Sequence, residues 1–430
     1  MRYSPSFLLK SELFRNTSVL ISGTAVAQLI PILLQPVLRR FFPPEIFGSY
    51  SVYSSLIGII MVVASFRYEL AIILPKKDNE AANLFFLTVF LSLIFNLTLL
   101  FLILIWNTEI LSFLNLSQGF SAYLYVVPLG AFLLSFYQSI NYWLVRKKKF
   151  FPISLNKFIR RGFEGTAQIT FKFLKFSHGL VIGDLIGQFA NVISGIFQGS
   201  RTNLSFRLFS FEKIKSVFVK YSEYPRFNII PAFMSACSYF LPSVIINKFY
   251  SSEITGYFDL SKQLLSIPLA LIASSISNVL LQRISEKNKL QLSIRKDLLS
   301  ILIFVGISVI LEVGLIMFWS EDVFKICFGA RWILSGSISR ILVWAFAYNF
   351  IVSSFSSIFI SLNKIKMLSI WQFLYFISIL TLFFFNNVSF NNFLKIYVLI
   401  ELICCTFSTI LMINIIMNYE KGLQQKPLQN

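Results

Sequence analysis

Residues 82–106 read ANLFFLTVFLSLIFNLTLLFLILIW, a run of 25 residues that contains no charged side chain. At about 1.5 Å per residue, a helix of this length exceeds the roughly 30 Å hydrocarbon core of a bilayer. Comparable apolar runs recur along the chain, so the sequence predicts an all-α integral membrane protein with twelve transmembrane helices. We place these helices at residues 16–38, 47–66, 82–106, 121–144, 153–174, 178–199, 225–247, 254–281, 298–319, 333–361, 365–386 and 391–417.

The overall composition supports this assignment. Hydrophobic residues make up 56% of the 430 residues and charged residues only 13%, against about 25% charged residues in an average soluble protein. The mean hydropathy is +0.73. The longest loop between predicted spans covers residues 200–224, and we therefore expect no appended soluble domain.

The net charge of +19 would suggest a nucleic-acid partner in a soluble chain, but in a membrane protein it reports orientation. With the N-terminus inside, the inner flanks of the predicted spans carry 24 Lys and Arg residues, and the outer flanks carry 8. This bias predicts that both termini are cytoplasmic. We therefore expect no nucleic-acid partner.

The cysteines and the single histidine indicate no metal site or disulfide framework. Cys237, Cys327, Cys404 and Cys405 form no CxxC pair, and His178 has no Cys or His companion at ligand spacing. The chain also lacks a P-loop, an HExxH motif and a nucleotide-binding fingerprint. The sequence thus predicts a protein without cofactors that is not an enzyme.

The chain repeats itself at an offset of 208 residues. Residues 40–48, RFFPPEIFG, align with residues 248–256, KFYSSEITG, and Phe, Glu, Ile and Gly recur in register. Each half then holds six spans, an even number, so both halves enter the membrane from the same side and the repeat is parallel. We predict two six-helix bundles, residues 1–205 and residues 206–430, with a cleft between them.

The predicted span at residues 153–174 differs from the others because a polar stripe runs along it. At about 100° per residue, the polar positions fall within an arc of roughly 120°, and apolar residues cover the rest. One face of this helix therefore suits water or anions, which suggests that something charged crosses the membrane beside it. The stripe consists of Lys157, Arg160, Arg161, Glu164, Gln168, Lys172 and Lys175.

Five short stretches together carry a family resemblance. They are Ser22–Gln28 (SGTAVAQ), Arg39–Gly48 (RRFFPPEIFG), Arg67–Pro75 (RYELAIILP), Tyr224–Asn228 (YPRFN) and Glu253–Tyr257 (EITGY). In these stretches the chain resembles the polysaccharide flippases of the multidrug/oligosaccharidyl-lipid/polysaccharide (MOP) exporter superfamily, in particular the Wzx-type O-antigen group. The resemblance covers essentially the whole chain, and it rests on the combination of stretches, since each is weak alone.

The resemblance implies a MOP-flippase-like fold with twelve helices in two bundles. It also implies that the protein translocates undecaprenyl-pyrophosphate-linked oligosaccharide, such as an O-antigen repeat unit, across the bacterial inner membrane by alternating access, with coupling to H⁺ or Na⁺. The sugars would then reach a polysaccharide polymerase or ligase. The expected partners are this lipid-linked substrate and membrane lipid, and the expected assembly is a monomer.

Under this interpretation, Arg160 and Arg161 are the main candidates for contact with the pyrophosphate, because a guanidinium presents forked donors that match phosphate oxygens. One alternative is an internal ion pair with Glu164. Another is a helix that lies flat in the membrane interface, but it would invert all later spans, which the charge bias opposes. Further cationic candidates for the cavity are Lys157, Arg226, Lys262 and Arg340.

Buried carboxylates are the candidates for cation coupling, since an apolar setting lets a carboxyl group exchange protons near neutral pH. Glu164 and Asp184 are favoured because both lie in the half that carries the stripe, and the other acids within spans are Asp259, Glu312 and Glu401. Aromatic and amide side chains suit a glycan path. The sequence does not choose among Tyr53, Tyr137, Asn141, Tyr142, Tyr239, Trp344, Tyr348, Asn349 and Gln372.

Two other functions stay open at this point. A multidrug or cation antiporter of the same superfamily would need a net acidic cavity, whereas six basic residues lie within the predicted spans in addition to those counted on the flanks. A membrane polysaccharide polymerase would need a substantial extracytoplasmic loop, and every predicted outer loop is short. The sequence therefore favours the flippase over both.

Overall fold

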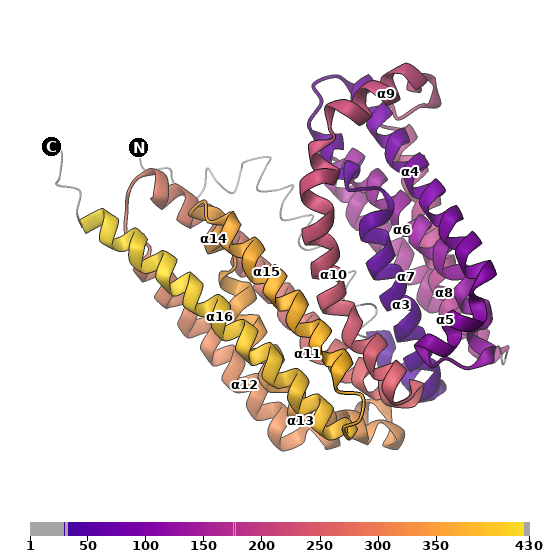
Figure 1. Cartoon of the computed structure of the whole chain (residues 1–430), viewed down its shortest axis with the longest axis vertical. Coiled ribbons are helices and arrows are strands. Elements are labelled where there is room, and N and C mark those ends of the chain that lie inside the picture. Colours follow the sequence, from indigo (N-terminus) through magenta and orange to yellow (C-terminus); the bar gives the residue numbers. More distant parts are fainter. Residues whose placement is uncertain (1–29, 31–32, 175, 177, 425–430) are drawn as a thin grey trace. The chain divides into compact units, whose positions relative to one another are not determined.

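The computed structural model describes residues 30, 33–174, 176 and 178–424. These residues form helices joined by loops, without any strand, and Figure 1 shows the course of the chain. The long helices are α3 (Pro44–Ala64), α4 (Asp78–Ile105), α6 (Ser121–Arg146), α7 (Phe150–Phe173), α8 (Gly179–Ser200), α10 (Glu223–Phe249), α11 (Ser252–Lys289), α12 (Arg295–Phe328), α13 (Ile333–Phe355), α15 (Ile365–Leu380) and α16 (Phe390–Gln424). The shorter elements are η1 (Tyr68–Ile73), α5 (Asn107–Leu114), η2 (Gln118–Phe120), η3 (Phe206–Leu208), α9 (Phe211–Lys220), η4 (Ala330–Trp332), α14 (Ser357–Ser361) and η5 (Thr381–Phe384).

Ten helices in the described part of the chain are long and apolar enough to cross a membrane. They match ten of the twelve predicted spans, and α7, with 24 residues, matches the striped span. The remaining span, residues 16–38, lies mostly outside the described residues, as does the whole stretch Ser22–Gln28, although residues 33–41 are helical. The predicted all-α membrane fold is therefore confirmed, and the structure is consistent with twelve spans.

The described residues form two compact units. The first unit runs to Phe240 within α10 and includes Ser251–Glu253, whereas the second comprises Leu241–Tyr250 and the chain from Ile254 onward. The repeat placed its boundary at residue 205, yet α9, which follows that point, packs on α4 in the first unit (Figure 1). The division of the chain by duplication stays a prediction, since a compact unit and a duplicated segment need not share a boundary.

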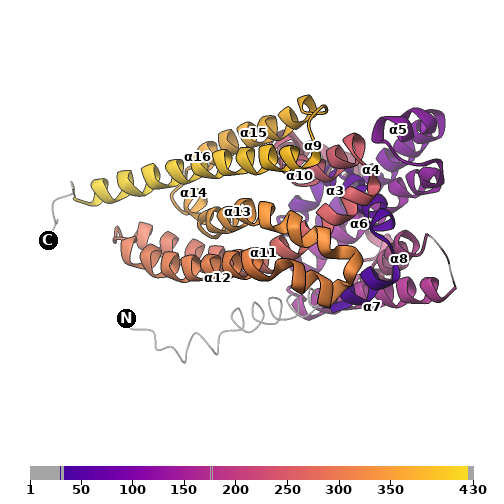
Figure 2. The ribbon, with the colours of Figure 1, turned by 90° about the horizontal axis from the view of Figure 1, so that it is seen from below.

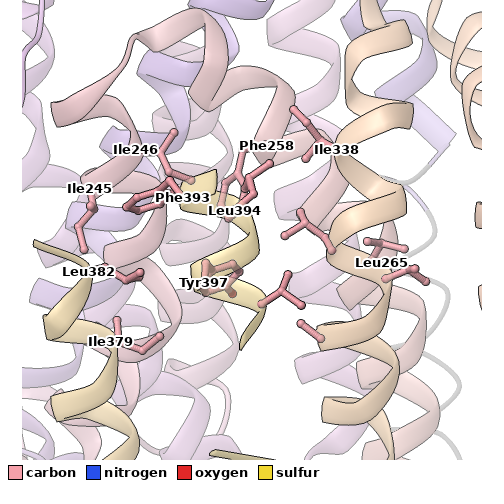
Figure 3. Close-up of a cluster of buried hydrophobic side chains, with 14 of the residues drawn as sticks. Ile245, Ile246, Phe258, Leu265, Ile338, Ile379, Leu382, Phe393, Leu394 and Tyr397 are labelled. Carbon is pink, nitrogen blue, oxygen red and sulfur yellow. The ribbon is translucent and has the colours of Figure 1, made fainter. Parts of the chain in front are cut away.

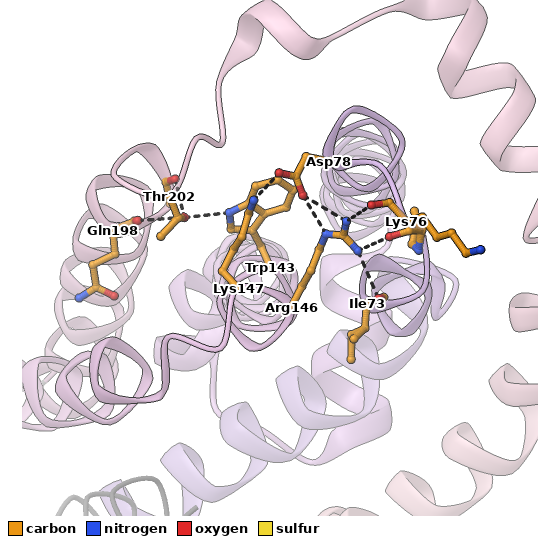
Figure 4. A network of polar contacts seen from close by, with 10 residues as sticks. Ile73, Lys76, Asp78, Trp143, Arg146, Lys147, Gln198 and Thr202 are labelled. Atoms are coloured by element: carbon orange, nitrogen blue, oxygen red, sulfur yellow. Dashed lines mark hydrogen bonds and ion pairs between the residues drawn. The ribbon is translucent and has the colours of Figure 1, made fainter. Parts of the chain in front are cut away.

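In the first unit, a polar network fixes the last turn of α6 between two neighbouring connections (Figure 4). The Arg146 guanidinium donates to the Ile73 carbonyl oxygen and forms an ion pair with Asp78, with 3.1 Å between Nη2 and Oδ1. On the other side of α6, the Trp143 indole donates to the Thr202 hydroxyl at 2.9 Å. These contacts connect α6 to the start of α4 and to the end of α8.

The second unit packs around a buried apolar cluster (Figure 3). Its members are Ile245, Ile246, Phe258, Leu265, Ile316, Ile338, Leu342, Val343, Ala345, Ile379, Leu382, Phe393, Leu394, Tyr397 and Val398. Figures 1 and 2 show α15 beside α16, and the Trp371 indole of α15 donates to the Cys404 carbonyl oxygen at 2.9 Å. Burial of the apolar cluster holds the end of α10 together with α11, α12, α13, α15 and α16.

Candidate functional site

The α7 and α8 helices pack backbone to backbone because glycines line the side of α8 that faces α7. A Cβ atom at Gly187 would lie 2.7 Å from the Arg160 carbonyl oxygen, and one at Gly183 would lie 3.0 Å from the Gln168 backbone nitrogen. Since glycine has no Cβ atom, the two backbones can meet at these points. The polar stripe of α7 therefore faces α8 over much of its length.

The glycines of α8 form a pattern that the sequence analysis missed. Glycine stands at positions 179, 183 and 187, each against α7, and again at 195 and 199, where the neighbours are Ile140 of α6 and Leu204. Small residues at four-residue spacing lie on one side of a helix and mark a close contact with another helix in membranes. This spacing is the signal that could have identified α8 as the partner of the striped helix.

Two ion pairs hold the centre of the stripe. Arg160 Nη2 lies 3.3 Å from Asp184 Oδ1 of α8, and Arg161 Nη1 lies 2.8 Å from Glu164 Oε2 on its own helix. The Gln188 amide donates to the second carboxylate oxygen of Asp184 at 2.5 Å. Both carboxylates are buried. The structure thus brings four predicted site residues together, and Arg161 forms the internal pair with Glu164 that the sequence had left open.

Amide groups continue this polar contact toward both ends of α7. The Asn156 amide donates to Gln198 Oε1 at 2.8 Å and accepts from the Ser194 hydroxyl at 2.8 Å. At the other end, the Gln168 amide donates to the Leu180 carbonyl oxygen at 3.1 Å. The last stripe residue, Lys175, lies outside the described residues.

Three tyrosines from neighbouring helices complete the cluster. Tyr50 and Tyr53 of α3 interact electrostatically with Asp184 and Arg160, and their rings stack with centroids 6.1 Å apart. Tyr137 of α6 lies within electrostatic range of Arg160. Tyr53 and Tyr137 were among the predicted glycan-path residues, whereas Tyr50 was not. We call the set Tyr50, Tyr53, Tyr137, Asn156, Arg160, Arg161, Glu164, Gln168, Asp184 and Gln188 the polar cluster.

The polar cluster has hydrogen-bonding capacity that the described residues do not use. Tyr53 Oη, Arg160 Nε and Gln188 Oε1 are buried atoms without a hydrogen-bond partner there, and so is Asn191 Oδ1 one turn further along α8. A buried polar group left unsatisfied costs about 1–3 kcal/mol. Four such groups on three adjacent helices indicate a place where water or a polar ligand binds.

The other predicted cationic residues have different surroundings. Lys157 is half-buried on α7, and Arg226 is exposed on α10 with its guanidinium 5.5 Å from the ring centre of Phe227. Arg340 belongs to the second unit, where its Nη1 lies 2.8 Å from Glu321 Oε1 of α12. The acid that pairs with Arg340 is 19 residues away, so the sequence around Arg340 did not reveal it.

The second unit contains its own buried charges around Lys262. This lysine of α11 interacts electrostatically with Asp259 and with Glu401 of α16, and all three are buried. The Tyr375 hydroxyl donates to Glu401 at 2.6 Å, and the Gln263 amide donates to Asp259 at 2.9 Å. Lys262 thus lies among carboxylates within its own unit, and its assignment to the substrate cavity stays a prediction.

A further buried carboxylate lies in the connection after α3. Glu69 of η1 forms an ion pair with Arg67 at 3.2 Å and accepts a hydrogen bond from the Ser65 hydroxyl at 2.5 Å. Arg67 has a φ of +62°, the left-handed conformation that turns the chain sharply here. Burial raises the pKa of Glu69, and the Ser65 hydrogen bond and the Arg67 charge oppose that rise.

The described cysteines and His178 show no metal site. The four thiols are free, and no three His, Cys, Asp or Glu side chains within the described ranges are grouped to hold a metal ion. His178 Nδ1 instead lies 2.6 Å from the Tyr123 hydroxyl of α6.

Comparisons with known proteins identify the family and the fold. A family profile described as "Polysaccharide biosynthesis protein" matches residues 37–337, which is more than half of the chain. None of the curated proteins matches the sequence. Family membership therefore rests on the profile.

Several solved transporters share the fold at low sequence identity. An inward-facing multidrug resistance MATE family transporter of the MOP superfamily has a TM-score of 0.73 at 16% identity, covering 92% of this chain and 96% of its own. The lipid II flippase MurJ, in an inward closed conformation, has a TM-score of 0.72 at 14% identity, covering 94% and 91%. An outward-facing MATE transporter of the same superfamily has a TM-score of 0.60 at 14% identity, covering 99% and 100%. The chain thus has the MOP fold that its sequence predicted.

Proposed function

Because the chain belongs to the polysaccharide biosynthesis protein family, we propose that it is a flippase for undecaprenyl-pyrophosphate-linked oligosaccharide, an O-antigen or related surface polysaccharide repeat unit. It moves this substrate across the bacterial inner membrane by alternating access. The family description supports the polysaccharide, and the fold is shared with a protein described as a lipid II flippase. The single observation that carries the proposal is the polar cluster, a buried set of charged and hydroxyl groups inside a membrane protein.

The polar cluster has donors that suit a pyrophosphate group. Arg160 and Arg161 are adjacent, and a guanidinium fork can bind two phosphate oxygens at once. The hydroxyls of Tyr50 and Tyr53 and the amide of Gln188 add neutral groups of the kind that bind sugar hydroxyls. The cationic residues Lys157, Arg226, Lys262 and Arg340 extend the proposed substrate path.

The two ion pairs suggest how binding is coupled to a cation. Asp184 and Glu164 occupy donors of Arg160 and Arg161, so a pyrophosphate competes with them for the same guanidinium groups. Protonation of either carboxyl group removes the competitor and releases the arginine for the substrate. Loss of the proton restores the ion pair and expels the anion. We therefore propose Glu164 and Asp184 as the coupling residues and H⁺ as the ion.

The remaining assignments follow from this function. We place both termini in the cytoplasm, as the charge bias predicts, with two six-helix bundles divided near residue 205. The protein acts as a monomer without a cofactor, takes its substrate from membrane lipid, and delivers it to a polysaccharide polymerase or ligase.

The test replaces the charges of the polar cluster in a strain whose surface polysaccharide depends on this protein. The double variant R160Q/R161Q leaves two buried carboxylates uncompensated, at a cost of about 3–5 kcal/mol for each broken pair, and this can impair folding. The quadruple variant R160Q/R161Q/E164Q/D184N keeps a neutral, hydrogen-bonded contact instead. We expect this variant to insert in the membrane and to abolish surface polysaccharide, whereas R201Q, at an exposed arginine after α8, preserves it.

The outcome also separates the competing functions. Normal surface polysaccharide in a membrane-inserted quadruple variant would refute a role of these charges in glycolipid transport. Export of cationic dyes by the wild-type protein, abolished in the quadruple variant, would instead indicate a multidrug antiporter.

A further inference from the structure

The segment of residues 206–220, which comprises η3 and α9, exposes large apolar side chains next to basic ones. Phe206 is 83% exposed and Phe211 is 74% exposed, and Phe209, Phe218 and Val219 are also exposed. Arg207, Lys213 and Lys215 are exposed on the same segment. Apolar groups beside cationic groups are typical of helices that lie in the membrane interface.

The phenylalanines of α9 lie on a different flank from Lys213 and Lys220, whereas Lys215, about 40° around the helix from Phe211, lies beside the phenylalanines. At 100° per residue, residues seven apart share one side of a helix, so Phe211 and Phe218 lie together and Lys213 and Lys220 lie together. The side between the two flanks packs on α4 through Ile214 and the buried Val217. With α4 crossing the membrane, one flank of α9 can face the lipid while the other faces the aqueous side.

The lipid-facing surface of α4 continues into this segment. Phe86 of α4 contacts Phe206 and Phe209, with ring centroids 5.2 Å and 5.6 Å apart. Phe90 and Leu97, which share the side of α4 that Phe86 occupies, are exposed apolar residues on a helix that spans the membrane. Phe206 and Phe209 therefore extend a surface that the bilayer already covers.

Hydrogen bonds from the segment, and one from Tyr221 directly after it, fix the segment to α4 and η1. The Asn83 amide of α4 donates to the Leu208 carbonyl oxygen, and Asn83 Oδ1 accepts from the Ser210 backbone, both at 2.9 Å. The Tyr68 hydroxyl donates to the Phe218 carbonyl oxygen at 2.8 Å, and the Tyr221 hydroxyl donates to Glu80 at 3.0 Å. Lys220 also pairs with Glu80. Any force that the membrane exerts on α9 therefore acts on α4 and the first unit.

We propose that residues 206–220 form a binding site for anionic phospholipid headgroups at the membrane surface where α4 begins. Phe206, Phe209 and Phe211 insert at the acyl boundary, and Arg207, Lys213 and Lys215 bind the lipid phosphates. The charge bias predicts that this is the cytoplasmic surface, whose leaflet carries the anionic lipid that attracts basic segments. The site anchors the first unit to the plane of the membrane and does not depend on which substrate the protein transports.

The experiment measures lipid contacts of the full-length protein in nanodiscs. In a background with Cys237, Cys327, Cys404 and Cys405 replaced by Ala, F211C carries a bimane label, and S216C, on another side of α9, is the matched control. One preparation contains brominated phosphatidylglycerol in phosphatidylcholine without bromine. The other contains brominated phosphatidylcholine with phosphatidylglycerol without bromine. We expect strong quenching at 211, weak quenching at 216, and greater quenching per brominated lipid by phosphatidylglycerol than by phosphatidylcholine.

Removal of the basic residues tests the headgroup contact. The K213Q/K215Q variant should lower the preference for phosphatidylglycerol by roughly fivefold per lysine removed. K148Q/K149Q, which removes two exposed lysines after α6, should leave it unchanged. Equal quenching by both lipids, or a preference that survives K213Q/K215Q, would overturn the proposed site. A label at 211 that neither brominated lipid nor aqueous iodide quenches would also overturn it, because protein would then cover the phenylalanines.

Discussion

Replacement of Gly187 by alanine tests whether the α7–α8 contact holds the polar cluster together. The new Cβ atom would lie 2.7 Å from the Arg160 carbonyl oxygen and 2.7 Å from the Glu164 Cβ atom. One of these is a backbone atom of a helix, which cannot rotate away as a flexible side chain would. The two helices must therefore separate, and the Arg160–Asp184 pair must lengthen.

The expected magnitude comes from a comparison with Gly162 of α7. A Cβ atom at Gly162 meets nothing within 4 Å. Both substitutions gain up to about 1 kcal/mol from the higher helix propensity of alanine, and only G187A adds overpacking, which costs about 1–3 kcal/mol. Because the propensity gain cancels, G187A should be about 1–3 kcal/mol less stable than G162A.

The assay is thermal unfolding of both purified variants in the same detergent, beside the wild type. We expect G162A to unfold at or slightly above the wild-type temperature and G187A to unfold several degrees below G162A. Surface polysaccharide measured in the same strains should fall for G187A alone. Equal unfolding temperatures for the two variants would refute the backbone contact between α7 and α8.

Two further substitutions test buried polar groups. Y53F removes a hydroxyl that has no hydrogen-bond partner in the described part of the chain, so we expect a free energy of unfolding that is unchanged or higher by up to about 1–2 kcal/mol, together with weaker transport. A fall in unfolding temperature would mean that the hydroxyl has a protein partner. For Glu69, burial raises the pKa in the folded state, so proton uptake by this carboxyl group favours folding. The contribution of Glu69 to the free energy of unfolding is therefore largest at acidic pH and declines as the pH rises through the raised pKa. E69Q should flatten this decline in a pH series of unfolding temperatures, and an identical pH profile would contradict the assigned cause.

The spans could be predicted from the sequence because apolar length alone sets them. The predicted span 121–144 is α6, Ser121–Arg146. The predicted span 254–281 continues to Lys289 as α11, because QRISEKNK at residues 282–289 favours helix in water as well. Hydropathy predicts the length of the helical segment within the bilayer. It does not predict where the helix ends beyond the bilayer.

The partners within the polar cluster could be predicted only in part. Periodicity showed that Arg160 and Glu164 share one face of a helix, and this limited the internal pairs that could form. It could not show that the face lies against α8 and not against water, because that depends on glycines 20 to 30 residues later.

The segment around α9 was missed for a different reason. Its ten residues are too short and too polar to register as a span.

The glycine contact also determines which part of this chain can be exchanged with a relative. Where two helices meet through side chains, a foreign helix can be accommodated by repacking. Here Gly183 and Gly187 meet backbone atoms, so a foreign α7 or α8 that shifts either helix along its axis would place a Cβ atom where none fits. A functional chimera should therefore take residues 150–200 from one parent, as a single hairpin.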